Sequence, residues 1–232
     1  MKKEGPKHVD EESKFIRHFI FGAEDGLIST FGFLAGITGA HLSHFTIVVA
    51  GIAGVFAAGL SMGIGTYLSS KSQLEVHRRN IEIEKEEIKK YPEHEKKELE
   101  EMYRKKGFKG KELKMIVDKI FSNKKVLLNE MLSSELGIKP SKFENPFKSS
   151  LIMFATFIIL ALIPLFPYLV FSVKQALVFS AIFSLIALFL VGAAKTRITK
   201  KSWFVAGLEM LILGAFAAGI TYYIGNLISG LY

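Results

Sequence analysis

Five apolar segments, each long enough to cross a lipid bilayer as a helix, dominate the chain. They occupy residues 18–40, 45–70, 147–170, 175–195 and 202–229. A membrane-spanning helix needs about 20 consecutive, mostly apolar residues. Nothing polar in a chain of 232 residues is large enough to enclose five such helices in a soluble core. The sequence therefore predicts an all-α integral membrane protein with five transmembrane helices.

The charged side chains lie almost entirely outside these segments. Of the 52 charged residues, 33 fall in residues 72–146 and nine in residues 1–17. We therefore predict an N-terminal tail (1–17), two spans (18–71), a charged helical domain (72–146) and three further spans (147–232). The chain contains no cysteine, which excludes a disulfide scaffold and any thiolate metal site.

Lysine and arginine predict the orientation, because they collect in the cytoplasmic loops of membrane proteins. With a cytoplasmic N-terminus, residues 72–146 and the loop 195–201 lie on the same side of the bilayer. The opposite side then receives only Lys174 of the 30 basic residues. The hydrophilic start of the chain lacks the pattern of a cleaved signal peptide. The net charge of +8 thus reflects sidedness at a lipid bilayer, and it requires no nucleic-acid partner.

Three carboxylates, those of Glu24, Asp25 and Glu209, fall inside the predicted spans. Such groups are costly in lipid and usually face a cavity, a partner or a substrate path. At the helical rise per residue, Asp25, Glu209 and Met62 all lie about 12 to 13 Å inside the cytoplasmic boundary. A carboxylate and a thioether at one level suit a divalent transition metal. We therefore assign Asp25 and Met62 to a transport path, with Glu24 and Glu209 as further candidates.

Glycines four residues apart recur in the first two spans. Such spacing lets helix backbones approach closely. It is expected for packing inside one protomer, and it also suits a seam between two protomers. The pairs are Gly22 and Gly26, Gly32 and Gly36, and Gly59 and Gly63.

The charged domain is predicted to hold three helical regions with carboxylates beside their apolar stripes. The second span should continue to Tyr91, Pro92 should start a second helix, and a third should run from about Lys111 to Leu136 with a break near Ser122. Burying an unpaired carboxylate is expensive, and a metal ion would supply the missing partner. A mixed oxygen and sulfur site is therefore predicted. Its ligands are Glu84, Glu87, Glu95, Glu98, Met131 and Glu135.

Four stretches together resemble the vacuolar iron transporter family. They are FIFGAEDGLISTFGFLAGITGA at 19–40, GLSMGIGTYLSSKSQLE at 59–75, PEHEKKELEEMYRKKG at 92–107 and NEMLSSELGI at 129–138. The resemblance covers nearly the whole chain beyond the N-terminal tail. The charged helical insert after the second span is unusual on its own and makes the combination specific.

The resemblance implies a homodimer of five-span protomers that moves iron(II) out of the cytoplasm in exchange for protons, along a path at the dimer interface. The family's spanning aspartate falls on Asp25 and its path methionine on Met62. The ligands of its cytoplasmic metal-binding domain fall on the six residues named above. Some members carry a further acidic residue eight positions before the methionine, where this chain has Gly54. Glu24 or Glu209 could substitute for it.

Two other classes of function stay open. ExxE pairs also suit a di-iron oxidase, although such sites usually add Glu-x-x-His pairs, which this chain lacks. A membrane-anchored metal buffer or sensor would bind metal without transporting it. We expect no enzyme activity and no prosthetic group, with iron(II), manganese, cobalt or zinc as substrate. The expected location is the cell membrane of a prokaryote or the vacuolar membrane of a eukaryote.

Overall fold

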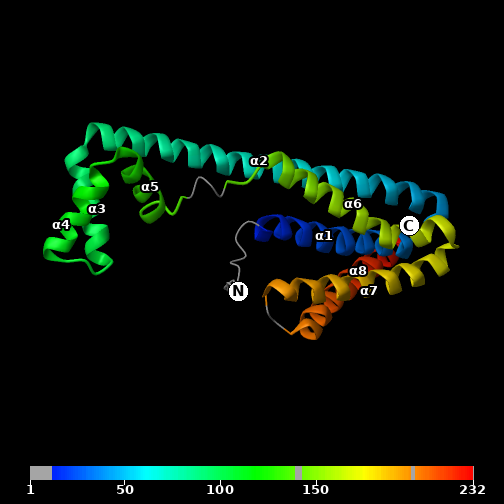
Figure 1. Ribbon diagram of the computed structural model, residues 1–232. Helices are drawn as coiled ribbons and strands as arrows, with labels where there is room; N and C mark the ends of the chain where they lie inside the picture. The colour runs from blue at the N-terminus through cyan, green and yellow to red at the C-terminus, as the bar shows by residue number, and fades with distance from the viewer. Residues whose placement is uncertain (1–11, 139–142, 200–201, 232) are drawn as a thin grey trace, which may run out of the picture. The chain divides into compact units, whose positions relative to one another are not determined.

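The computed structural model of the protein describes residues 12–138, 143–199 and 202–231. Within those ranges all regular structure is helical, in eight helices without a strand (Figure 1). In chain order they are α1 (Glu12–Gly39), α2 (His44–Lys90), α3 (Pro92–Lys105), α4 (Gly110–Phe121), α5 (Lys124–Ser134), α6 (Pro146–Val170), α7 (Val173–Thr199) and α8 (Trp203–Ser229).

The chain divides into two compact units, each described here by itself. The membrane unit comprises Met1–Leu68 and Asn145–Tyr232, and the insert unit comprises Ser69–Glu144. Five helices are long and apolar enough to cross a membrane: Ile16–Gly39, His44–Lys90, Pro146–Val170, Val173–Thr196 and Trp203–Ser229. This confirms the prediction of an all-α protein with five spans.

Helix α1 packs against α6, α7 and α8, and close backbone contacts hold it to two of them (Figure 1). A Cβ atom on Gly26 would lie 2.6 Å from the backbone oxygen of Phe157 on α6, and one on Gly36 would lie 3.2 Å from that of Thr221 on α8. The glycine pairs of α2 likewise face side chains of α6. The predicted glycine spacing is therefore used in packing inside the protomer.

Hydroxyl groups in the membrane unit donate to backbone carbonyls of neighbouring helices. Thr221 Oγ1 on α8 donates to Gly32 O on α1 at 2.7 Å, and Ser150 Oγ on α6 donates to Gly63 O on α2 at 2.7 Å. Ser180 Oγ on α7 donates to Pro164 O on α6 at 2.8 Å. Such bonds place a polar atom between helices where lipid offers no alternative partner.

The insert unit contains the end of α2 and all of α3, α4 and α5 around one apolar cluster. Proline at position 92 starts α3, and Gly107 ends its last turn with a φ of +101°. The expected third helical region consists of two helices, because Asn123 interrupts the helix. Its side chain caps α5 by accepting hydrogen bonds from Lys125 N and Val126 N. The cluster consists of Ile88, Leu99, Tyr103, Leu113, Val117, Ile120, Leu127 and Met131.

Candidate functional site

Two glutamates of the insert unit are buried beside its apolar cluster. Glu84 on α2 is 3% exposed and Glu95 on α3 is 2% exposed. Each lies four residues before a cluster residue of its own helix, Ile88 or Leu99, so helical geometry places it on the same face. Glu84 Oε1 and Glu95 Oε2 are buried without a hydrogen-bond partner among the described residues. Two hydrogen-bond acceptor atoms thus lie in an environment that is largely shielded from water.

The charges of these glutamates influence one another, which shows that the side chains gather in one place. Burial, followed by the charges of Glu135, Glu95 and Glu87, raises the pKa of Glu84 to about 8. Burial and the charges of Glu98, Glu87 and Glu135 raise the pKa of Glu95. Glu84 is also hydrogen-bonded to Glu95. The pair therefore holds a proton at neutral pH, and a divalent cation could replace that proton.

The other predicted ligands stand around this pair with different exposure. Met131 on α5 is fully buried in the cluster, whereas Glu87 and Glu135 are exposed. Glu98 lies 3.4 Å from the exposed His94 Nε2. Helical phase places Glu135 inside the α5 stripe, but the helix ends at Ser134 and Glu135 is its C-cap, because Gly137 follows with a φ of +63°.

The insert thus brings together five carboxylates, but not in the geometry of a closed metal site. Burial and the charges of Glu98 and Glu87 raise the pKa of Glu135, which ties the α5 end to the same group. Across the described ranges, no three His, Asp or Glu side chains are placed to hold one ion together. The arrangement can still offer several oxygens beside the Met131 thioether, and two of them have no hydrogen-bond partner in the part of the chain that the structure describes. That donor set suits a borderline divalent ion such as iron(II).

In the membrane unit, residues of α1 and α2 line an open cavity of about 430 Å³. It is lined by Ser29, Thr30 and Phe33 from α1 and by Gly54, Val55, Ala57 and Ala58 from α2. A Cβ atom on Gly54 would lie 3.1 Å from the ring of Phe33. A longer side chain at position 54 would therefore displace that ring or fill this cavity.

Asp25 and Met62 lie beyond the same end of this cavity. Asp25 is one helical turn before Ser29, and Met62 is one turn after Ala58. Because α1 and α2 are joined by a short turn and run in opposite directions, both steps lead the same way along the unit by about 5.4 Å. Asp25 is half-buried, and no side chain in the described ranges pairs with its carboxylate. A shared metal site of Asp25 and Met62 stays a prediction.

Glu24 and Glu209 have different surroundings from Asp25. Glu24 faces α7, where Lys195 Nζ lies 3.2 Å from its Oε1. Glu209 lies on the exposed side of α8 and has no partner within the described part of the protomer. Sequence reasoning missed Lys195 as a partner, because it treats a lysine at a span end as a group that reaches the interface. A pairing across 171 residues leaves no local signal.

Comparison with known proteins identifies the chain's relatives. The model of the VIT family matches residues 16–226. The chain is 33% identical over 217 residues to a protein of Centaurea cyanus named vacuolar iron transporter, with 93% of this chain and 89% of that protein covered. It is 32% identical to vacuolar iron transporter 1 of Oryza sativa subsp. japonica (94% and 86% covered) and 30% identical to the vacuolar iron transporter of Plasmodium berghei (96% and 86% covered). These relatives are named as transporters, which are not enzymes, and this confirms the prediction of no enzyme activity. The chain belongs to the VIT family.

Proposed function

We propose that this protein transports divalent metal across a membrane, with iron(II) as its main substrate and manganese, cobalt and zinc as chemically similar alternatives. The observation that carries the proposal is the pair of buried, unpartnered carboxylate oxygens of Glu84 and Glu95. A buried carboxylate oxygen without a partner costs free energy, and a bound cation would offset that cost. The names of the relatives support transport rather than storage or sensing.

In the proposed mechanism, the insert unit captures metal on the cytoplasmic side and raises its supply to the membrane unit. Glu84, Glu87, Glu95, Glu98 and Glu135 supply oxygen ligands, and Met131 supplies a sulfur ligand. The ion then binds between Asp25 and Met62, contributed by both protomers of a homodimer. Intramembrane carboxylates of this kind are expensive unless they serve such a path.

Proton exchange follows from the chemistry of Asp25. An ionised carboxylate binds the metal, and a protonated one returns without it. The exit of each metal ion from the cytoplasm would then be coupled to the entry of protons. Gly54 offers no second carboxylate beside this path, so Asp25 carries the coupling in this proposal.

The proposal is tested in proteoliposomes that hold a pH-sensitive dye and a metal-sensitive dye. Wild-type protein should move iron(II) down its gradient and drive protons the opposite way, and Asp25→Asn should abolish both signals. Glu75→Gln, at an exposed carboxylate that lies 3.8 Å from Lys71 Nζ, serves as the matched control and should behave as wild type. Undiminished proton counterflow in Asp25→Asn would refute the coupling. Metal binding without flux in wild-type protein would indicate a buffer or sensor.

A further inference from the structure

Helix α5 carries the sulfur ligand of the proposed metal site but is short. It spans 11 residues and ends immediately before Glu135. An isolated helix of this length is marginal in water. Its position and its rotation about its own axis must therefore come from contacts with neighbouring helices.

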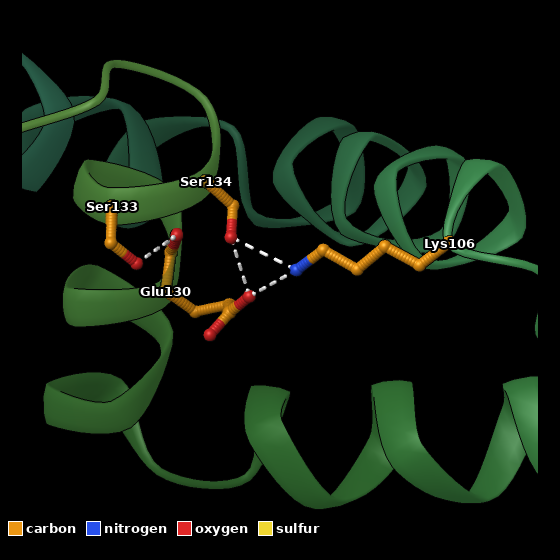
Figure 2. A network of polar contacts seen from close by, with 4 residues as sticks. All are labelled: Lys106, Glu130, Ser133 and Ser134. Atoms are coloured by element: carbon orange, nitrogen blue, oxygen red, sulfur yellow. Dashed lines mark hydrogen bonds and ion pairs between the residues drawn. The ribbon is translucent and has the colours of Figure 1, made fainter. Parts of the chain in front are cut away.

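One polar network joins α5 to the residue that follows α3 (Figure 2). Lys106 Nζ donates to Glu130 Oε1 at 2.8 Å and to Ser134 Oγ at 3.0 Å. Ser134 Oγ in turn donates to the same Glu130 oxygen at 2.7 Å. The three groups form a closed triangle of hydrogen bonds across the two segments. We call it the Lys106 clamp.

The clamp is partly shielded from water, although the Lys106 side chain is 44% exposed. The Glu130 side chain is 24% exposed. The lysine ammonium also lies 4.4 Å from the centre of the Tyr103 ring, a cation–π contact.

Helical phase connects the clamp to the ligands. Glu130 and Ser134 are four residues apart and form one stripe of α5, while Met131 and Glu135 form the next stripe, displaced by about 100° around the axis. Fixing the first stripe fixes the direction of the second. Building on the proposed function of the insert unit, we propose that Lys106 is a positioning residue that sets the rotation of α5 so that Met131 and Glu135 face the carboxylates of α2 and α3.

The test compares Lys106→Met with Lys105→Met in the full-length protein in detergent, because Lys105 is the neighbouring, exposed lysine at the end of α3. Manganese(II) binding should weaken by about tenfold or more in Lys106→Met, the range seen when groups that orient metal ligands are removed. Lys105→Met should bind as wild type. X-ray absorption of bound cobalt(II) should show a sulfur neighbour in wild type and lose it in Lys106→Met.

A charge swap separates positioning from folding. The double variant Lys106→Glu/Glu130→Lys rebuilds the ion pair with its ends exchanged, and it should recover both affinity and the sulfur neighbour. Equal affinity and an intact sulfur neighbour in Lys106→Met would overturn the clamp while leaving the metal site in place. Loss of affinity that the swap does not recover, together with rapid hydrogen exchange throughout α3 and α4, would also overturn it. Absence of manganese binding in wild type would instead refute the proposed function.

Discussion

The membrane unit and the insert unit differ in which of their buried polar atoms have hydrogen-bond partners. In the membrane unit, hydroxyls of Thr221, Ser150 and Ser180 each donate to a backbone carbonyl of another helix. Two buried hydroxyls there, of Ser149 and Ser184, have no partner among the described residues, but they carry no charge. The insert unit instead leaves carboxylate oxygens of Glu84 and Glu95 buried and unpartnered.

The difference separates packing from binding. Between membrane helices, lipid supplies no hydrogen bonds, so stability comes from close backbone contact and from satisfied hydroxyls. The insert unit borders water and could have used a purely apolar core. Carboxylates kept there at a cost in stability indicate a binding role, because a cation can return that cost when it binds.

The largest effect is expected from opening the close contact between α1 and α6. Gly26→Leu places a side chain against the backbone oxygen of Phe157, which cannot move aside as a flexible side chain would. Overpacking of this kind costs about 3 kcal/mol, and we expect little folded protein on size-exclusion chromatography. Gly65→Leu is the control, because a Cβ atom there meets nothing within 4 Å. Normal yield and elution of Gly26→Leu would contradict the packing described here.

The second-largest effect is expected from Glu84→Gln, which should raise the stability of the metal-free protein and weaken metal binding. Glu84→Gln removes a carboxyl group that must be protonated to stay buried, so the metal-free protein should gain on the order of 2 kcal/mol at neutral pH. The same change should weaken manganese(II) binding at least about tenfold. Glu86→Gln on the same helix, an exposed carboxylate paired with Lys90 at 2.9 Å, should change neither quantity appreciably. A destabilised Glu84→Gln protein that still binds metal would reverse the interpretation.

The pH dependence of the metal-free insert should follow the raised pKa of Glu84. Its folded pKa of about 8 exceeds the ordinary value of 4.5, so the folded state holds the extra proton between those values. The contribution of Glu84 to stability should therefore be greatest below pH 4.5 and be lost as pH rises through 8. Hydrogen exchange of α3 and α5 amides should accelerate over that window, and less so in Glu84→Gln. Metal affinity should rise over the same window, because metal displaces the proton.

The smallest effect is expected for the ion pair inside the membrane unit. Lys195→Met leaves Glu24 without the ammonium that lies 3.2 Å away, and we expect a loss of about 1 kcal/mol, because both side chains keep some access to solvent. The double variant Glu24→Gln/Lys195→Met should regain most of that loss. Trp203, the single tryptophan, packs against Phe189 of α7 and reports thermal unfolding by fluorescence. A double variant no more stable than Lys195→Met would show that the pair contributes little.

Local periodicity was enough to predict the five spans and the burial of Glu84 and Glu95. Both depend on the helix that contains them: apolar length for the spans, and spacing from Ile88 and Leu99 for the glutamates. The environment of Glu24 could not be predicted in this way, since Lys195 reaches it from another helix. The end of α5 could not be predicted from helical phase, because a left-handed glycine two residues after Glu135 ends the helix. The Lys106 clamp likewise joins segments whose sequences contain no sign of each other.

The contacts of α1 and α2 differ in kind, and this has a consequence for movement. Gly26 and Gly36 set the α1 backbone directly against backbone atoms of α6 and α8, whereas Gly59 of α2 meets the flexible side chain of Ile158. Backbone contacts resist sliding, while side-chain contacts can exchange rotamers. Helix α1 therefore has less freedom to slide at Gly26 and Gly36 than α2 has at Gly59.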